Sequence, residues 1–381
     1  MASGITEHRS LLCMPKVRRR PLGFSHLDFP APLAPYAPAV VSFYFSNLLP
    51  VPLVGLPRKV EIVDKYGGLD SVESGHEEVD RVQIGLIGTG IMGAPMAANL
   101  LAAEFSLTVH DVRPESADQA LDAGAKWADT TAAACDGAEV VLMSLPTPEV
   151  VEAVALEAIA AMTSGSVLVD HSTSPPSLMR QLASDAARCG IEFLDAPVSG
   201  GQAGARRGTL SVMVGGEAGV LERCRPVFQA IGENIYHVGA VGTGDVAKLV
   251  NNMLCFIHMW AAVEGIALGA RAGVDPNVLR DIVSTSSGNS AIWRGGTAAM
   301  LRDRLQPSFD MKLIAKDMGL ALGMARELEV PTAMAHRADA LITEYLESGY
   351  ADSDIFGTIR AMEARTGAEV RGRWRDDDAS A

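Results

Sequence analysis

The sequence predicts an α/β domain with a mostly parallel sheet, then an all-helical domain, the two joined by one long central helix. Strand patterns alternate with helical patterns over residues 81–244. Residues 245–272 are an unbroken run of good helix formers, and no strand pattern follows up to residue 368. Repeated βα units of this length imply parallel strands with helices on both faces, because each parallel connection needs a crossover.

Composition limits the classes of function. The chain has 381 residues, enough for two domains. Its 32 Lys and Arg stand against 46 Asp and Glu, and the formal charge of −14 argues against a nucleic-acid partner. Five scattered cysteines without a CxxC pair predict buried thiols in a reducing compartment and no metal site. We therefore expect a cytoplasmic protein.

Residues 1–80 read as a disordered extension. Nine of the twenty prolines lie before residue 58, which disfavours packed structure. Up to Leu27 there are five Lys or Arg residues and one acid, Glu7, so residues 1–30 resemble a weak transit peptide and leave organellar targeting open. Residues 61–80 carry seven Asp or Glu, as a linker does.

The first βα unit contains a dinucleotide fingerprint. Val82–Ile87 reads as a buried strand and Ala94–Glu104 as a helix, with G-x-G-x-x-G between them. Gly88 allows the tight turn, Gly90 lets a pyrophosphate approach the backbone, and Gly93 lets the helix pack on the strand. The pattern predicts a Rossmann-type domain. Its expected cofactor-binding loop is Gly88, Thr89, Gly90, Ile91, Met92 and Gly93.

The second expected strand, Leu107–His110, ends in Asp111, eighteen residues after Gly93. An acid at this point accepts hydrogen bonds from the adenosine ribose and repels a 2′-phosphate, which favours NAD over NADP. Arg113 lies two residues further on, and a nearby arginine is how such sites accommodate that phosphate. NAD is therefore the expected cofactor, and NADP stays open.

Further βα units extend the sheet. The expected strands are Val140–Ser144, Ser166–Asp170, Glu192–Ala196, Leu210–Gly215 and Asn234–His237, with helices from Pro148 and Pro175. Ligands bind beyond the carboxyl ends of such strands, where the chain has loops at 145–147, 171–173 and 197–201. His171 reads as a loop residue beside the cofactor rather than a base, because the sequence offers no acid to orient it. The loop Ser199–Gly201 offers a hydroxyl and unhindered amides, as an anion cradle does, although a flexible turn has the same residues.

The predicted central helix, residues 245–272, would be about 42 Å long. Lys248 and Asn252 are four residues apart near its start, so they share one face. An ammonium and a carboxamide side by side on a rigid helix suit a proton donor and a substrate orienter, although a solvated helix start has the same composition. A membrane span is disfavoured, because polar residues interrupt the apolar run.

After Gly273 the pattern is helical throughout. The expected helices are Pro276–Ser284, Ala291–Arg304, Leu313–Leu328, Thr332–Glu347 and Ser353–Arg365. Trp293 and Phe309 lie where this half would cap a substrate, and core packing is the favoured role for both. Residues 369–381 are charged and small, so we expect a frayed tail.

Five separated motifs occur in one order along the chain. They are GLIGTGIMG at 85–93, DAPVSGG at 195–201, GTLSVMVGG at 208–216, GTGDVAKLVNN at 242–252 and KDMGLA at 316–321. Together they resemble the β-hydroxyacid dehydrogenase family, most strongly its 3-hydroxyisobutyrate dehydrogenase and tartronate semialdehyde reductase branch. The resemblance covers about residues 82–366, and residues 1–80 have no counterpart in it.

The resemblance implies roles for the matching positions. Lys248 would be the catalytic lysine, which gives a proton to the carbonyl oxygen or takes it back, while Asn252 would hold substrate and Lys316 would close over the cofactor. The substrate carboxylate would be bound by Ser199, Gly200 and Gly201. The nicotinamide side of the cofactor would be lined by Leu145, Pro146 and Thr173. The helical half would make the contact of a homodimer or homotetramer.

The leading hypothesis is an NAD-dependent oxidoreductase that interconverts a short 3-hydroxyacid and its semialdehyde by hydride transfer. A rival is an NADP-preferring reductase of tartronate or succinic semialdehyde. Lys248 argues against an imine reductase of the same scaffold, because that family lacks a lysine at this position. The presence of Lys248 together with Asn252 argues against a catalytically silent dinucleotide-binding regulator, which would not need the pair. Arg206 and Arg207 could contact a second anionic group, against the simpler reading of a solvated loop. The sequence leaves the hydroxyacid, the reaction direction and the oligomer size open.

Overall fold

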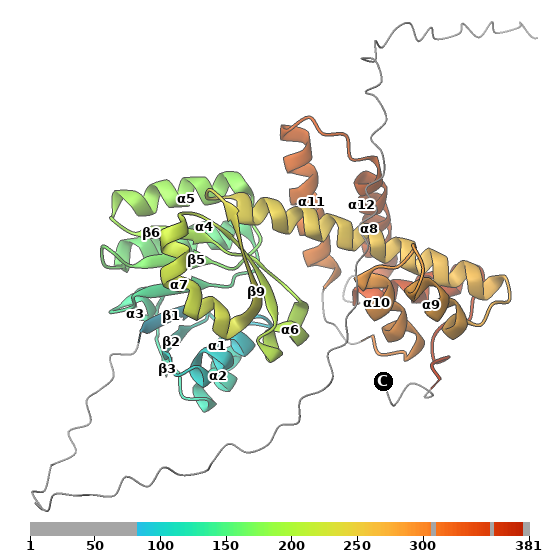
Figure 1. Ribbon diagram of the computed structural model, residues 1–381, viewed down its shortest axis with the longest axis horizontal. Helices are drawn as coiled ribbons and strands as arrows, with labels where there is room; N and C mark the ends of the chain where they lie inside the picture. The colour runs from blue at the N-terminus through green and yellow to red at the C-terminus, as the bar shows by residue number, and fades with distance from the viewer. Residues whose placement is uncertain (1–81, 306–309, 351–353, 376–381) are drawn as a thin grey trace, which may run out of the picture. The chain divides into compact units, whose positions relative to one another are not determined.

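The computed structural model describes residues 82–305, 310–350 and 354–375 (Figure 1). The predictions for residues 1–80, including targeting by residues 1–30, lie outside the described residues. So do the predictions for Phe309 and for the tail from residue 376. Below, the sheet half means residues 82–242 and the helical half means the described residues from 272 to 375.

The sheet half contains a nine-stranded sheet in the order β3-β2-β1-β4-β5-β6-β8-β7, with β9 paired to β8. The strands are β1 (Gln83–Ile87), β2 (Ser106–His110), β3 (Lys126–Trp127), β4 (Val140–Met143), β5 (Val167–Asp170), β6 (Glu192–Asp195), β7 (Val198–Ser199), β8 (Leu210–Gly215) and β9 (Gly232–Gly239). Strands β1 to β6 pair in parallel, and β9 is parallel to β8. The predicted, mostly parallel sheet is confirmed.

One part of the sheet was not expected. Strand β8 runs antiparallel to both β6 and β7. Strands β3 and β7 have two residues each, too few to show an alternating pattern. The direction of β8 leaves no trace in its own sequence either, because parallel and antiparallel strands share the same period of two.

Helices cover both faces of the sheet and form an apolar core on each (Figure 1). Successive residues of a strand point to opposite faces and therefore enter different cores. On β4, Val140 and Leu142 belong to the first core, while Val141 and Met143 belong to the second. The first core is covered by α1 (Gly93–Ala102), η1 (Pro114–Ala117), α2 (Asp118–Asp122), α6 (Gly201–Arg207) and α7 (Ala218–Ile231). The second is covered by α3 (Thr131–Cys135), α4 (Pro148–Ala161) and α5 (Pro176–Arg188).

The central helix α8 spans Thr243–Arg271, 29 residues, close to the predicted range. Its first turn is bound to the sheet half by Asp195 at the end of β6. The two oxygens of this carboxyl accept hydrogen bonds from the backbone N–H groups of Gly242 (2.7 Å) and Asp245 (3.0 Å). A Cβ on Gly244 would lie 2.3 Å from a backbone oxygen of β8, so the helix approaches the sheet closely. A carboxylate at this end also stabilises the helix start.

The helical half packs against the rest of α8. It contains α9 (Pro276–Ser284), α10 (Ala291–Leu301), α11 (Met311–Glu327), α12 (Ala333–Tyr345), the turns η2 (Leu346–Tyr350) and η3 (Ile355–Gly357), and α13 (Thr358–Thr366). Phe256 and Met259 of α8 are buried with α11 and α12, and Val263 and Ile266 with α10 and α13. Among the described helices, α8 is the one long and apolar enough to cross a membrane, and burial in a protein core selects the same composition.

The tail predicted to be frayed from residue 369 is attached to the helical half at Val370 and Trp374, while its other described residues are exposed. Val370 is fully buried, and its backbone N–H donates to Glu363 Oε1 at 2.9 Å. The guanidinium of Arg302 lies 3.6 Å from the ring centroid of Trp374. The charged composition of the tail concealed these two apolar side chains, which are enough to dock it.

Candidate active site

The glycine loop has the geometry that a dinucleotide phosphate requires. Gly88 has φ +94°, and a Cβ there would lie 2.3 Å from the backbone oxygen of Ser144. A Cβ on Gly93 would lie 1.9 Å from the backbone oxygen of Gly88, so α1 begins in direct contact with the turn. The space beside Gly90 is open, and no described side chain caps the N-terminus of α1. The amides of Gly88 and Thr89 donate within the protein, whereas those from Gly90 to Gly93 lie at the uncapped start of α1, where the phosphates of a dinucleotide fit.

Asp111, predicted to bind the ribose, also organises the loop. Its carboxylate accepts hydrogen bonds from the backbone N–H of Thr89 and of Arg113, each at 2.9 Å. The Arg113 side chain is 66% exposed, with Nε 4.0 Å from the carboxylate. Of the two apolar loop residues, Ile91 is exposed and Met92 packs on the first core. The carboxylate is thus held in position by the backbone before any cofactor binds.

The loops after β4 and β5, which carry the residues predicted to line the nicotinamide, are bonded to each other. The backbone N–H of Leu145 donates to Ser172 Oγ at 2.9 Å, and the backbone N–H of Ser172 donates to Asp170 Oδ1 at 3.0 Å. Leu145 and Thr173 are half-buried and Pro146 is exposed. The structure therefore places the three predicted residues on two connected loops at one edge of the sheet.

His171 is a structural side chain, as expected, rather than a base. It is buried, its Nδ1 donates to the backbone oxygen of Ala196 at 2.7 Å, and its ring meets Phe228 edge to face. Burial lowers the pKa of His171 to about 4, against a smaller opposing effect of the hydrogen bond to Ala196. The imidazole is therefore neutral at physiological pH, with a fixed tautomer.

Lys248 lies in the second turn of α8 and is half-buried. Burial lowers the pKa of its ammonium, while the carboxyl of Asp317 and the thiol of Cys255 act in the opposite direction. A lowered pKa increases the fraction of neutral amine near physiological pH. This is the property that a general base needs.

A chain of polar contacts connects α8, α11 and the loop after β5. The Nδ2 of Asn252, a buried side chain, donates to Asp317 Oδ2 at 2.7 Å. The other carboxylate oxygen lies 2.9 Å from Lys316 Nζ, which also donates to the backbone oxygen of Thr173 at 2.9 Å. Asn252, Lys316 and Thr173, predicted from three separate stretches, are thus joined through Asp317. Lys248 lies one turn before Asn252 on α8, and the charges of Asp317 and Lys316 both act on its pKa.

Sequence reasoning missed two residues of this group. Asp317 is 3% exposed, and its signal was an acid at helical spacing between the buried apolar residues Ile314 and Ala321. The Nδ2 of Asn251 lies 3.5 Å from Ser199 Oγ and 3.1 Å from Asn252 Oδ1. Asn251 therefore connects the central helix to the predicted substrate loop.

The loop predicted as an anion cradle has a backbone geometry that depends on its glycines. Gly200 and Gly201 have φ values of +131° and +62°, conformations that favour glycine. Ser199 beside them is half-buried. Arg206 and Arg207 lie exposed in the last turn of α6, which agrees with the solvated reading of these two arginines.

Comparison with known proteins identifies the family. The NAD binding domain of 6-phosphogluconate dehydrogenase matches residues 83–239, and the NAD-binding domain of NADP-dependent 3-hydroxyisobutyrate dehydrogenase matches residues 242–362. The 3-hydroxyisobutyrate dehydrogenase of Pseudomonas aeruginosa is 40% identical over 275 residues, which cover 70% of this chain and 92% of that protein. The chain belongs to the β-hydroxyacid dehydrogenase family.

Two further similarities agree with membership of the β-hydroxyacid dehydrogenase family. The NAD-dependent L-serine dehydrogenase of the same bacterium is 41% identical over 284 residues, covering 72% of this chain and 95% of that protein. The structure of Mycobacterium tuberculosis 3-hydroxyisobutyrate dehydrogenase with L-serine has a TM-score of 0.68 and 31% identity, covering 74% of this chain and 99% of that one. The protein is an NAD(P)-dependent 3-hydroxyacid dehydrogenase that interconverts a hydroxyacid and its semialdehyde.

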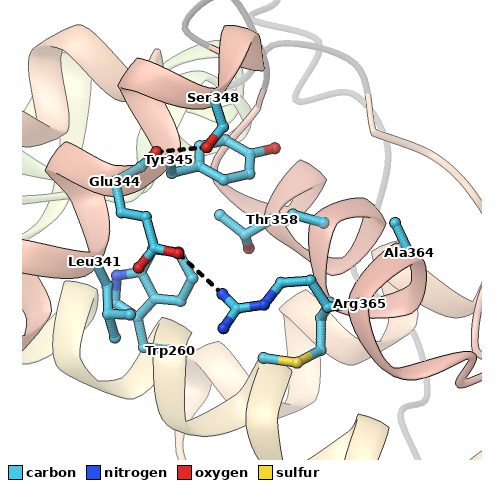
Figure 2. A pocket seen from close by; sticks show the side chains of 10 residues that line it. Trp260, Leu341, Glu344, Tyr345, Ser348, Thr358, Ala364 and Arg365 are labelled. Atoms are coloured by element: carbon cyan, nitrogen blue, oxygen red, sulfur yellow. Dashed lines mark hydrogen bonds and ion pairs between the residues drawn. The ribbon is translucent and has the colours of Figure 1, made fainter.

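A separate cavity of about 180 Å³ lies in the helical half of this dehydrogenase, between α8, α12 and α13 (Figure 2). The rings of Trp260 and Tyr345 meet edge to face in its wall, with centroids 6.2 Å apart. At the rim Arg365 donates to Glu344 at 3.1 Å, so these two charges already neutralise each other. None of the predicted site residues lines the cavity. The cavity is therefore separate from the predicted site around Lys248.

Proposed function

We propose that the protein oxidises a short 3-hydroxyacid to its semialdehyde, or catalyses the reverse reduction, with NAD as cofactor and Lys248 as general acid and base. The observation that carries the proposal is the position of Lys248. Its ammonium has a pKa lowered by burial, and the charges of Asp317 and Lys316, which lie in the polar group with Asn252 and Thr173, act on it. This group adjoins the loops that the fold assigns to a nicotinamide cofactor.

Each group has a defined task in this reaction. Bound NAD supplies the acceptor for the hydride that leaves the carbinol carbon. The amine of Lys248 takes the hydroxyl proton as that carbon becomes a carbonyl, and its ammonium returns the proton during reduction. Because charge develops on the substrate oxygen in both directions, a cation at that oxygen stabilises the transition state. The hydroxyl of Ser199 and the amides of Gly200 and Gly201 bind the carboxylate, and Asn252 orients the substrate.

The lowered pKa of Lys248 suits the direction of oxidation, since only a neutral amine accepts the proton. Burial favours the neutral form, and the positive charge of an oxidised nicotinamide acts in the same direction. The oxidation rate should therefore rise with pH through an ionisation that lies below the ordinary lysine pKa. A profile with no ionisation between neutral and mildly alkaline pH would contradict the assignment.

The preference for NAD is supported by Asp111. Its carboxylate is fixed by the amides of Thr89 and Arg113 at the position where a ribose 2′-phosphate would be repelled. The name of the matched NAD-dependent L-serine dehydrogenase agrees with this preference, whereas the family model for residues 242–362 is named for an NADP-dependent enzyme. Steady-state kinetics with both cofactors decides the point, and a higher kcat/KM with NADP would overturn it.

The substrate is best identified by following NADH formation by the full chain across a panel of acids. The panel contains 3-hydroxyisobutyrate, L-serine, 3-hydroxypropionate, glycerate and, as a chain-length control, 4-hydroxybutyrate. We expect one acid with the hydroxyl on its third carbon to exceed the others by orders of magnitude in kcat/KM. Uniformly absent turnover with intact cofactor binding would instead favour a silent dinucleotide-binding regulator.

We infer that the protein forms a homodimer or homotetramer through an exposed face of α8 and α9 on which apolar side chains accompany the polar His258 and Glu264. On α8, Val250, Leu254 and Leu268 are 41%, 45% and 72% exposed, and their spacing of four and fourteen residues places them on one helix face. On α9, Val278 and Ile282 are 45% and 54% exposed. Sedimentation equilibrium tests this proposal: Leu254→Glu with Leu268→Glu should yield a monomer. A wild-type chain that is already monomeric would refute it.

A further inference from the structure

Three carboxyl side chains are buried around the first turn of α8. They are Asp170 at the end of β5, Asp195 at the end of β6, and Asp245 on the helix itself, and each is 0% exposed. Acids are almost never buried to this extent unless they are paired. Asp170 and Asp245 nevertheless each retain one buried oxygen, Oδ2, without a hydrogen-bond partner in the described part of the chain.

The three carboxyls differ in their hydrogen bonds. Both oxygens of Asp195 accept backbone N–H groups at the helix start, which is the environment of an anion. Among the described residues, the carboxyl of Asp170 accepts hydrogen bonds from Ser172 alone, with the backbone N–H at 3.0 Å, and that of Asp245 accepts the backbone N–H of Ser174 at 2.9 Å. A buried carboxyl with a bare oxygen beside other acids is far less costly as a neutral acid than as an anion.

The charged neighbours identify Asp245 as the acid that keeps its proton. Burial raises the pKa of Asp170 to about 6 and that of Asp195 to about 6, so both ionise near neutrality. Burial, followed by the charge of Asp170 and then by that of Asp195, raises the pKa of Asp245 well above its usual value. The backbone N–H of Ser174 and the charge of Lys316 oppose this effect and favour ionisation of Asp245. Lys248 also favours it, since the charge of Asp245 in turn raises the pKa of Lys248.

Asp245 also lies between two segments of the site. Ser174, whose N–H it accepts, directly follows Thr173, and the carbonyl of Thr173 accepts the bond from Lys316. Lys248 is three residues after Asp245 and therefore lies on the same face of α8. One carboxyl group thus joins the loop after β5 to the helix that carries the proposed base.

We propose that Asp245 is a positioning residue for the reaction: its protonated carboxyl ties the first turn of α8 to Ser174 and so fixes Lys248 against the loop at Thr173. The protonated form matters, because an anion at Asp245 would hold Lys248 as an ammonium, which cannot accept a proton. This inference rests on the proposed role of Lys248.

Difference infrared spectroscopy of the full chain tests the protonation directly. At mildly alkaline pH, where Asp170 and Asp195 are ionised, we expect the C=O stretching band of a neutral carboxylic acid. Asp245→Asn should remove that band, and Asp118→Asn, at an exposed position on α2, should leave it intact. A wild-type spectrum without the band, or a band that persists in Asp245→Asn, would overturn the proposal.

Kinetics tests the positioning role. Asp245→Ala removes the acceptor for Ser174 and should lower kcat about tenfold. Asp245→Asn keeps a neutral acceptor of the same shape and should recover most of that loss, to within about threefold of the wild type. Thermal melting should first verify that both variants are folded. An Asn variant as slow as the Ala variant would then show that a carboxylate is needed and would refute the positioning role of the protonated carboxyl.

The two proposals fail separately. If Lys248→Ala retains full turnover, the proposed role of Lys248 as acid and base is wrong, whatever the infrared spectrum shows. If the Ala variant of Asp245 does not fold, the infrared band and the rate of Asp245→Asn still decide, because a loss beyond tenfold in the Asn variant contradicts the inference.

Discussion

The sheet half and the helical half contribute to the site by different means. The sheet half offers backbone: the amides of the glycine loop, the carbonyl of Thr173 and the amides of Gly200 and Gly201. The central helix and α11 offer side chains, foremost Lys248 and Lys316. Backbone sites depend on glycine and on turn geometry, whereas side-chain sites depend on which helices meet. The first kind leaves a pattern in a short stretch of sequence, and the second kind does not.

We expect the largest effect from a substitution that removes the key side chain and leaves the backbone groups of the cofactor loops unchanged. Lys248→Ala should lower kcat by about 10²–10⁴-fold, the usual contribution of a general acid or base. The dissociation constant of NAD, measured by calorimetry, should stay near the wild-type value, because the cofactor loops belong to the sheet half. Lys126→Ala, at an exposed position on β3, is the matched control. Wild-type turnover by Lys248→Ala would show that the side chains of the central helix do not carry the catalytic step.

The converse experiment damages the backbone site. In Gly93→Ala the new Cβ would lie 1.9 Å from a backbone oxygen, so α1 must shift, at a cost of about 1–3 kcal/mol. We expect a lower Tm and a dissociation constant for NAD raised by about tenfold or more.

Gly323→Ala is the control for this change, because nothing lies within 4 Å of its Cβ position in α11. It should raise the free energy of unfolding by about 0.5–1 kcal/mol without affecting NAD binding. Equal behaviour of the two variants would mean that the glycine loop is not under the steric constraint described above.

A smaller effect should come from the carboxyl that joins the side-chain groups. Asp317→Asn weakens the charge-assisted bond to Asn252 and should lower kcat about tenfold. Because the carboxyl of Asp317 raises the pKa of Lys248, its removal should lower that pKa further and move the rising limb of the oxidation pH–rate profile to lower pH. Glu327→Gln, exposed at the end of α11, should leave the profile in place. If the rising limb of the pH–rate profile moved to higher pH instead, Asp317 would lower the pKa of Lys248, contrary to the effect assigned to it here.

The smallest effect is expected at the two arginines beyond the substrate loop. Arg206→Ala and Arg207→Ala remove exposed charges and should change kcat/KM by less than about twofold. A larger loss, confined to substrates with two anionic groups, would show that these side chains recognise the second one.

Much of the fold was predictable because buried parallel strands show as short apolar runs, as β4 and β5 do. The long helix was predictable from its uninterrupted helix formers. Strand β7 was not predictable, because two residues are too few to show a period. The packing of Val370 was not predictable either, because it is an isolated apolar residue in a charged tail. These elements are defined by what they pack against.

The site divides in the same way. The loop from Gly88 to Gly93 was visible because three glycines with fixed spacing have one steric explanation. Lys248 and Asn252 were visible as neighbours on one helix. Asp317 was not, because its partner Asn252 is 65 residues away and only the meeting of two helices reveals the bond. The sign that such a contact leaves in the sequence is an acid at the spacing of the buried apolar residues of a helix.

The attachment of the first turn of α8 to Asp195 determines where this chain could be recombined with a relative. A junction at the end of β9 would transfer Asp245 away from Asp195, whose carboxyl binds the N–H of that residue. A junction after Asn252 would separate that side chain from Asp317. A junction between residues 245 and 252 keeps both pairs intact, because Asp195 and Asp245 then come from one parent and Asn252 and Asp317 from the other. Chimeric enzymes built there would exchange the helical half as a unit and inherit their cofactor loops whole.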